Sequence, residues 1–126
     1  MKTLLIEPTY QMPKVNFDPD KGIFEIQGKS IPAYAYNFYR PILDWLDQYC
    51  LKPHATTHMR ILFYYYNTDS AKCILDIFKK LDELFKKGFE VKIEWLYEKG
   101  DTSSVEDAEY FSQFLSVPFE IVMVED

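Results

Sequence analysis

Two hydroxyl side chains lie between a strand-like run and a helix-like run of this sequence. Residues 59–66 are nearly all apolar or aromatic, which predicts a central strand buried on both faces. Between residues 71 and 85 the apolar side chains recur at helical spacing. Thr68 and Ser70 stand between these runs. We therefore expect both hydroxyls at a helix N-terminus, where backbone N–H groups and the helix dipole favour negative charge.

Such a hydroxyl has two interpretations. In the first it is only a cap, with Asn67 or Thr68 accepting a hydrogen bond from the N–H of Asp69, Ser70 or Ala71. In the second it is also phosphorylated, which adds about −1.5 to −2 charges at pH 7. Because that phosphate gains from the helix N-terminus but crowds Asp69, its consequence concerns docking at this end rather than stability. The residues alone favour the cap.

The composition predicts one acidic domain that spans residues 1–126. A net charge of −6 argues against non-specific binding to nucleic acid and against binding to an anionic membrane surface. Aromatic residues make up 17% of the chain, and many tyrosines stand beside expected core positions. These tyrosines either pack at the core margin or line an exposed protein-binding face.

The cysteines and the first residues indicate a cytoplasmic protein. Cys50 and Cys73 fall on different predicted helices and form no disulfide framework, which fits a reducing compartment. The apolar run at residues 1–6 ends at Glu7 and Pro8. It is too short for a signal peptide or a membrane span.

Strands and helices alternate along the chain, which is typical of a mainly parallel or mixed sheet. We expect a strand or an arm at 3–9, and strands at 14–18, 23–27, 59–66, 89–97 and 119–124. The predicted helices cover residues 33 to about 51, 71–85 and 105–115, with Pro41 marking a kink or the true start of the first. Residues 28–32 and 98–104 are expected loops, the latter with Ser103 or Ser104 as a helix cap.

Other combinations of reactive residues carry less weight. Cys50, His54 and His58 have a spacing that suits zinc on one continuous helix, but Pro53 interrupts it and no fourth ligand is near. The phosphate-binding, nucleophile-elbow and dinucleotide motifs are missing from the sequence, so we predict no catalytic residue, cofactor or metal. The acidic residues Asp82, Glu83, Glu90 and Glu94 have the spacing of solvated faces.

Over most of its length the sequence resembles the SiaC family of bacterial regulatory phosphoproteins, whose fold is similar to STAS domains, the anti-sigma factor antagonists. The densest match is Tyr66-Asn67-Thr68-Asp69-Ser70 with the helix that runs to Leu84. The other matching pieces are Pro13 to Gly22, Ile26-Gln27-Gly28-Lys29-Ser30, Phe38 to Tyr49 with Trp45-Leu46, Trp95-Leu96-Tyr97 and Pro118-Phe119. The resemblance implies a single STAS-like α/β domain with a mixed sheet of four to six strands and about three helices.

The resemblance also implies a threonine phosphoswitch, and the matching position is Thr68. It implies a kinase with a histidine-kinase-like ATPase fold and an opposing metal-dependent phosphatase of the protein phosphatase 2C type. The unphosphorylated form is expected to bind and activate a diguanylate cyclase, raising cyclic di-GMP and so controlling biofilm formation and aggregation. This role is not enzymatic.

We expect the residues around Thr68 to contact the kinase or the output partner. They are Asn67, Asp69, Ser70 and Lys72. One departure from the family pattern lies before the first long helix, where Pro32-Ala33-Tyr34 replaces the usual Pro-Glu-Asn and predicts a different choice of partner. Two rival functions remain: a small enzyme or ligand-binding domain with a pocket built by tyrosines, and a purely structural subunit in which Thr68 is only a cap.

Overall fold

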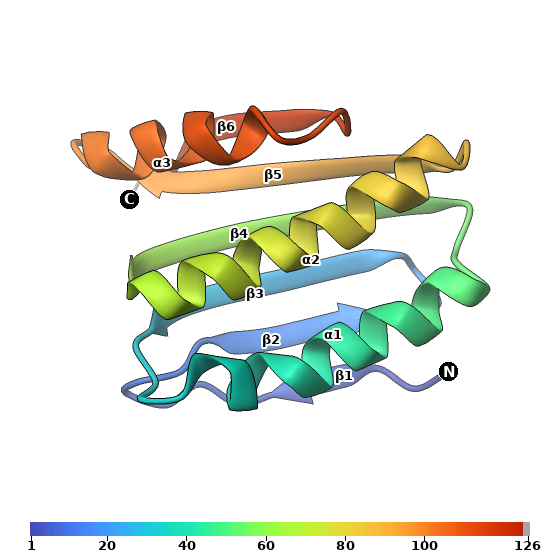
Figure 1. Ribbon diagram of the computed structural model, residues 1–126, viewed down its shortest axis with the longest axis horizontal. Coiled ribbons are helices and arrows are strands. Elements are labelled where there is room, and N and C mark those ends of the chain that lie inside the picture. Colours follow the sequence, from blue (N-terminus) through green and yellow to red (C-terminus); the bar gives the residue numbers. More distant parts are fainter. Residues whose placement is uncertain (125–126) are drawn as a thin grey trace.

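The computed structural model describes residues 1–124, which form a six-stranded sheet with three helices packed on one of its faces (Figure 1). The strands are β1 (Leu4–Ile6), β2 (Lys14–Asp18), β3 (Ile23–Ser30), β4 (Thr56–Tyr66), β5 (Glu90–Glu98) and β6 (Phe119–Val124). They lie in the sheet in chain order. The pairs β1–β2 and β2–β3 are antiparallel, whereas β3 to β6 are parallel neighbours.

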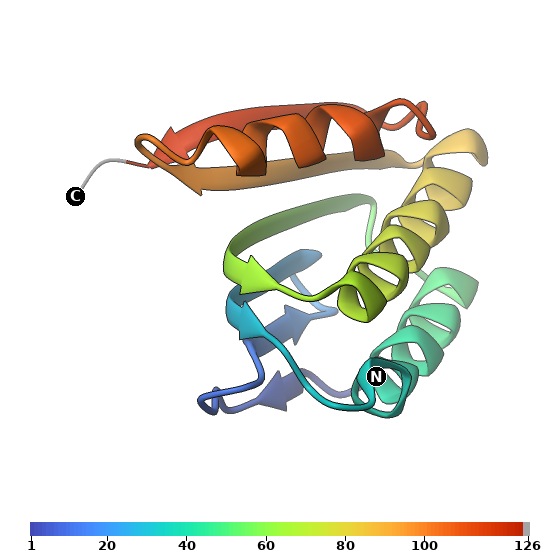
Figure 2. The same cartoon turned by 60° about the vertical axis from the view of Figure 1, so that its left-hand side comes forward.

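Each helix connects two parallel strands. Helix α1 (Ala35–Leu51) follows β3, α2 (Thr68–Lys86) follows β4 and α3 (Thr102–Ser112) follows β5. Because the strand order never reverses, crossovers of one hand place all three helices on the same side of the sheet. Figure 2 shows this layer of helices on one side and an uncovered face on the other. The core lies between the two layers, and its largest buried side chains include Trp95, Tyr39, Tyr49, Phe17 and Phe24.

The β2–β3 turn fixes where β4 begins. Gly22 in this turn has a φ of 67°, and a Cβ atom there would lie 2.0 Å from the carbonyl oxygen of Thr56. The carbonyl of Gly22 accepts a hydrogen bond of 2.7 Å from the N–H of His58. Only glycine combines this backbone angle with so close an approach.

Most of the expected elements are confirmed. The strands at 14–18 and 119–124 have the predicted bounds, and the mixed sheet with three helices is present among the described residues. Pro41 lies inside α1, so it does not mark the start of that helix. No helix in the described part of the chain has the length and apolar character that a membrane crossing requires.

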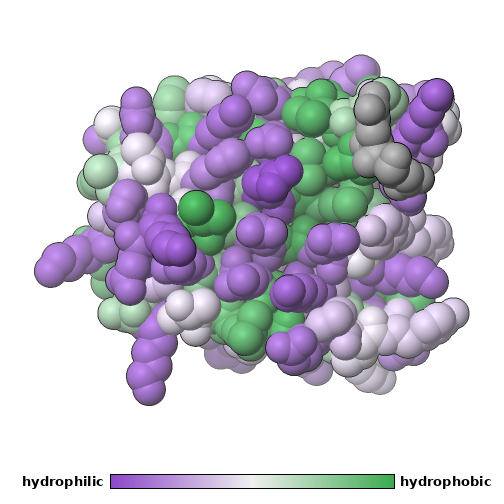
Figure 3. Space-filling view, turned by 180° about the vertical axis from the view of Figure 1, so that it is seen from behind, coloured by the Kyte–Doolittle hydropathy of each residue, from purple (hydrophilic) through white to green (hydrophobic). Residues whose placement is uncertain are grey.

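The prediction that β4 is buried on both faces was wrong. Burial alternates along this strand up to Phe63, because all three helices cover one face only. Tyr64 and Tyr65 at its end are 43% and 62% exposed. Figure 3 shows the uncovered face, where hydrophobic side chains lie among hydrophilic ones. A continuous apolar run therefore did not indicate two-sided burial here.

Three further boundaries differ from the prediction. The expected loop at 28–32 is partly strand, because β3 continues to Ser30 past an irregularity at Gly28/Lys29. Helix α3 begins at Thr102 rather than at residue 105, whereas α2 begins at Thr68, as the alternative with Asn67 as the cap requires. The cap of α3 is Asp101, whose side chain accepts from the N–H of Ser104 at 3.1 Å, so neither Ser103 nor Ser104 is the cap.

Candidate functional site

The N-terminus of α2 is capped by Asn67. Its side-chain oxygen accepts a hydrogen bond of 2.9 Å from the N–H of Ser70, and its Nδ2 donates to the carbonyl of Pro32 at 3.1 Å. Of the two cap candidates, the structure therefore selects Asn67 and not Thr68. Asp69 lies in the first turn, where its charge complements the helix dipole.

Ser70 is a buried structural residue with no exposed surface. Its hydroxyl donates to the carbonyl of Ser30 at 3.0 Å and accepts from the Ser30 hydroxyl at 2.9 Å. Because Ser30 has only one hydroxyl proton, Tyr39 is the donor in the 2.6 Å bond between Tyr39 and Ser30. Burial raises the pKa of Tyr39 well above its usual range, so its phenol keeps that proton. The Ser70 side chain cannot meet a partner or a kinase in this conformation.

Thr68 has the opposite surroundings. It is the first residue of α2 and its side chain is exposed. Among the described residues its hydroxyl takes part in no hydrogen bond. Asp69 and Lys72 beside it are exposed as well. A group attached to the Thr68 hydroxyl therefore breaks no hydrogen bond among the described residues.

Two hollows flank this helix end, at the carboxyl ends of the parallel strands. One, of about 340 Å³, lies between α2 and α3 and is lined by Tyr66, Thr68, Asp107 and Tyr110, among others. The other, of about 360 Å³, lies between α1 and α2 and includes Tyr34, Tyr36, Asp69 and Lys72.

Exposed tyrosines lie at or near the two hollows: Tyr34 and Tyr36 line one, Tyr110 lines the other, and Tyr65 precedes Tyr66 in β4. Tyr34 is 76% exposed, Tyr36 59%, Tyr65 62% and Tyr110 57%, and we call this set the tyrosine rim. The rim tyrosines are therefore exposed, whereas Tyr39 and Tyr49 are core residues. The departure at Ala33 and Tyr34 lies in the second hollow, beside Asp69 and Lys72.

The hollow next to Thr68 also contains a carboxylate that the sequence did not single out. The hydroxyl of Tyr66 donates a short hydrogen bond to Asp107 of α3. Burial first, and then the bond to Asp107, raise the pKa of Tyr66, so the phenol stays protonated. The two residues are 41 positions apart, and no local pattern relates them.

The N-terminus of α3 resembles that of α2 in its cap and in its first residue. Thr102 is its first residue and is exposed, and Asp101 caps the helix. Ser104 is buried, and its hydroxyl accepts from Nε1 of Trp95 at 2.9 Å. Local geometry therefore does not distinguish Thr68 from Thr102, which makes Thr102 a matched control.

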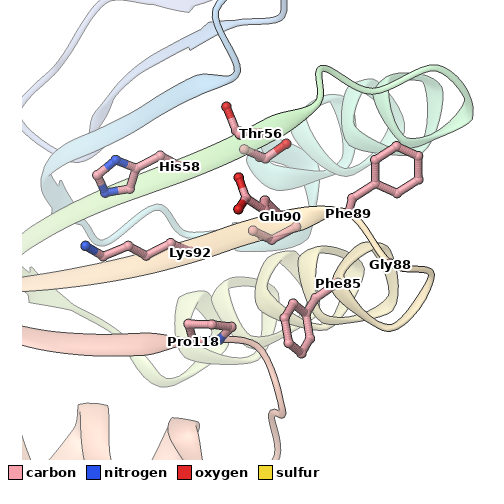
Figure 4. Close-up of a pocket in the computed structure, with 10 residues that line it drawn as sticks. Thr56, His58, Phe85, Gly88, Phe89, Glu90, Lys92 and Pro118 are labelled. Carbon is pink, nitrogen blue, oxygen red and sulfur yellow. The ribbon is translucent and has the colours of Figure 1, made fainter.

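A larger hollow lies at the other end of the sheet and has a volume of about 760 Å³ (Figure 4). Phe85, Phe89, Gly88 and Pro118 are among its lining residues, and none of the described residues that line it is a tyrosine. The tyrosines instead line the smaller hollows around Thr68.

The other reactive residues are dispersed. Cys50 on α1 and Cys73 on α2 are both free thiols. Nε2 of His58 lies 2.9 Å from Glu94 on the uncovered face of the sheet. Within residues 1–124 no three His, Cys, Asp or Glu side chains are placed to hold a metal ion.

One acidic residue was placed wrongly by the sequence. Asp82 was expected on a solvated face but is only 4% exposed. Its carboxylate accepts from the N–H groups of Ser116 and Val117 at 2.7 and 2.8 Å, and Lys86 lies 3.1 Å away. Burial by itself raises the pKa of Asp82, but these hydrogen bonds and Lys86 outweigh it and lower that pKa overall.

The protein is an α/β domain in which an exposed threonine at the N-terminus of α2 lines one of two neighbouring hollows. Comparison with known proteins identifies its family. The profile of the SiaC family regulatory phosphoproteins matches residues 6–124, so the chain belongs to this family.

Solved structures agree with this assignment. The crystal structure of apo-SiaC from Pseudomonas aeruginosa superposes with a TM-score of 0.88 at 30% identity, covering 97% of this chain and 99% of that one. SiaC crystallised in complex with the diguanylate cyclase SiaD, of which it is the activator, superposes with a TM-score of 0.91 at 28% identity, covering 96% and 99%. An uncharacterized protein of P. aeruginosa strain UCBPP-PA14 is 29% identical over 121 residues, which are 96% of each chain.

Proposed function

We propose that this protein is a non-enzymatic partner switch whose unphosphorylated form binds and activates a diguanylate cyclase. The observation that carries the proposal is the state of Thr68 in a SiaC family regulatory phosphoprotein: its side chain is exposed at the first position of α2 and no other residue depends on its hydroxyl. In P. aeruginosa, SiaC is the activator of the diguanylate cyclase SiaD. By extension, the output here is cyclic di-GMP and, through it, biofilm formation and aggregation.

The proposed switch is electrostatic. An unmodified Thr68 lets the cyclase pack against the N-terminus of α2, with Asn67, Asp69 and Lys72 at its margin. A phosphate in that interface would have to lose its water shell, which costs several kcal/mol unless an arginine or lysine receives it. Because about 1.4 kcal/mol corresponds to a tenfold change in affinity, this cost suffices to abolish a transient complex.

The local acidic groups strengthen this effect. Asp69 adjoins Thr68, and Asp107 lies in the same hollow. Each adds negative charge where the phosphate would stand, so the phosphorylated helix end repels an acidic partner surface and is costly to desolvate against an apolar one. Lys72 is the exposed cation nearest along the helix, one turn from Thr68.

Two enzymes would set the phosphorylation state. We assign phosphorylation of Thr68 to a kinase with a histidine-kinase-like ATPase fold, and its reversal to a metal-dependent phosphatase of the protein phosphatase 2C type. Both need access to Thr68, which its exposure provides. Ser70 is not proposed as a second phosphorylation site because it is fully buried.

Binding measurements with three variants test the proposal. Purified diguanylate cyclases from the host are titrated with wild-type protein, Thr68→Ala, Thr68→Asp and the matched control Thr102→Asp. We expect Thr68→Ala and Thr102→Asp to bind like the wild type, and Thr68→Asp to bind at least about tenfold more weakly. Cyclase activity is read in the same samples.

The rival functions give different results. A purely structural subunit predicts equal binding by Thr68→Ala and Thr68→Asp, because aspartate also caps a helix well. A ligand-binding domain or an enzyme predicts a tight small ligand or turnover in the absence of any cyclase. Either result would contradict the partner switch.

A further inference from the structure

The two edges of the sheet differ in how they are protected. At one edge, β1 has only three residues and is followed by Glu7 and Pro8. The indole of Trp45 also donates to the carbonyl of Lys2 at 3.0 Å, so α1 holds the chain that precedes β1. Short strands, charges and proline are the usual means by which edges avoid pairing with other chains.

The opposite edge strand, β6 (Phe119–Val124), has six residues and is therefore longer than β1, although Pro118 precedes it. Its sequence Phe-Glu-Ile-Val-Met-Val contains one charged residue and no proline or glycine. The pairing of β6 with β5 is regular from Phe119 to Val124, with no β-bulge. Met123 is 40% exposed, and Phe119, Ile121 and Val122 are half-buried. This is a full-length apolar strand at an open edge.

The backbone pattern shows which groups point outward. The N–H of Ile93 in β5 donates to the carbonyl of Pro118, which directs the backbone of Pro118 and Glu120 toward β5. Since successive residues of a strand alternate in direction, Phe119, Ile121 and Met123 point their N–H and C=O groups away from the sheet. Among the described residues these outward groups have no hydrogen-bond partner.

We propose that β6 pairs with β6 of a second copy of this chain, antiparallel and centred on Ile121, to form one continuous sheet across a two-fold dimer. In this register Ile121 faces Ile121 of the other copy, and Phe119 faces Met123. All three outward residues then exchange hydrogen bonds in pairs. The interface is isologous, as a closed dimer requires.

A second copy fits this edge because β6 is apolar on both of its faces. Ile121 and Met123 lie on the side of the helices, whereas Val122 lies on the uncovered side beside Leu96. A partner strand with one polar face would leave either Ile121 and Met123 or Val122 without an apolar neighbour. The lone charge, Glu120, does not oppose itself in this register and is held by Lys92 at 3.1 Å.

The edge of β6 does not include Thr68, so this inference does not rest on the proposed switch. Its test uses the full chain and a proline variant. Met123→Pro removes an outward N–H and leaves the ladder to β5 intact, because edge strands tolerate proline at outward positions. Met123→Thr is the control, since it changes the side chain but keeps the N–H.

Sedimentation equilibrium measures the molar mass of the wild type and of both variants as a function of concentration. We expect the wild type and Met123→Thr to rise from 15.0 kDa toward twice that mass between low and several hundred micromolar protein. Met123→Pro is expected to stay at 15.0 kDa with an unchanged circular dichroism spectrum. A wild type that stays monomeric throughout this range, or a dimer that survives Met123→Pro, would overturn the proposal.

Hydrogen exchange gives a second measurement that needs no variant. The amides of Phe119, Ile121 and Met123 should exchange more slowly as the wild-type concentration rises, because pairing protects them. If Met123→Pro does not fold, this measurement decides alone. Exchange at these three amides that is independent of concentration would overturn the proposal.

Discussion

Thr68 and Ser70 are two positions apart on α2, yet one faces solvent and the other is sealed inside the fold. The sequence predicted that both would lie at a helix N-terminus, and they do. It did not predict which is accessible, because that depends on Ser30 and Tyr39, which come from another strand and another helix. Accessibility is therefore a tertiary property that local spacing does not encode.

This difference predicts opposite effects on stability. Ser70→Ala removes the acceptor of the buried Ser30 hydroxyl proton and one of the two donors to the Ser30 carbonyl, so it should lower the free energy of unfolding by about 1–3 kcal/mol. Thr68→Ala should change it by less than about 0.5 kcal/mol, since it removes no contact. Urea denaturation of both variants measures the two effects. Equal losses would show that Thr68 is structural.

The cap itself was predicted only as a choice between two residues. Asn67 and Thr68 are both good N-cap residues, so residue type alone does not favour one over the other. The additional bond from Asn67 to the carbonyl of Pro32 explains the outcome, because it ties the cap to the loop before α1. Pro32 lies 35 positions before Asn67, so the sequence around the cap does not predict this bond.

At the scale of the elements, Asp82 joins α2 to the segment between α3 and β6. Its contacts to Ser116 and Val117 are 34 and 35 positions away in sequence. The helical pattern placed Asp82 on a solvated face, since charges on an amphipathic helix are usually exposed. The error arose because a carboxylate can be buried when backbone N–H groups and a lysine satisfy it.

The lowered pKa of Asp82 predicts how stability depends on pH. Because the folded state binds the proton less well than the unfolded chain, this contribution is present above the ordinary value of 3.8 and is lost as the pH falls below it. Asp82→Asn should therefore lower the free energy of unfolding by about 1–3 kcal/mol at pH 7, and by progressively less as the pH falls below 3.8. Denaturation at several pH values measures the difference.

Asp44→Asn is the control for this prediction. Asp44 is exposed and its nearest cation, Arg40, is 4.0 Å away, so the variant should match the wild type within about 0.5 kcal/mol. If the difference in the free energy of unfolding between Asp82→Asn and the wild type does not decrease in acid, the lowered pKa of Asp82 is not its cause.

The β2–β3 turn allows another comparison between matched residues. Gly22 and Gly88 both have positive φ, but a Cβ atom meets the Thr56 carbonyl at position 22 and nothing within 4 Å at position 88. Gly88→Ala should cost about 1 kcal/mol from backbone strain alone. Gly22→Ala should cost about 3 kcal/mol or more, because the clash adds to that strain. Thermal denaturation tests this order, and equal costs would contradict the close approach.

At the scale of the whole molecule, alternation of strands and helices predicted the mixed sheet, and the family resemblance predicted the same fold. What the pattern did not reveal is that every helix covers the same face. The apolar run of β4 suggested helices on both faces, whereas the chain-order sheet leaves one face open. Consequently half of the sheet's side chains and the outer edge of β6 are surfaces rather than core.

The molecule thus presents separate regions for separate tasks. The tyrosine rim and Thr68 lie at the carboxyl edge of the parallel strands, beside the two smaller hollows. The apolar strand β6 forms a lateral edge of the sheet. Modification of Thr68 therefore changes one surface and leaves the core and the lateral edge as they are.

Mass spectrometry of the protein isolated from its native host, in growing and in stressed cells, tests the central claim most directly. We predict a phosphate that maps to Thr68, with an occupancy that differs between the two conditions, and none on the buried Ser70. Absence of phosphate from Thr68 under every condition would contradict the switch and leave Thr68 as an ordinary first residue of a capped helix.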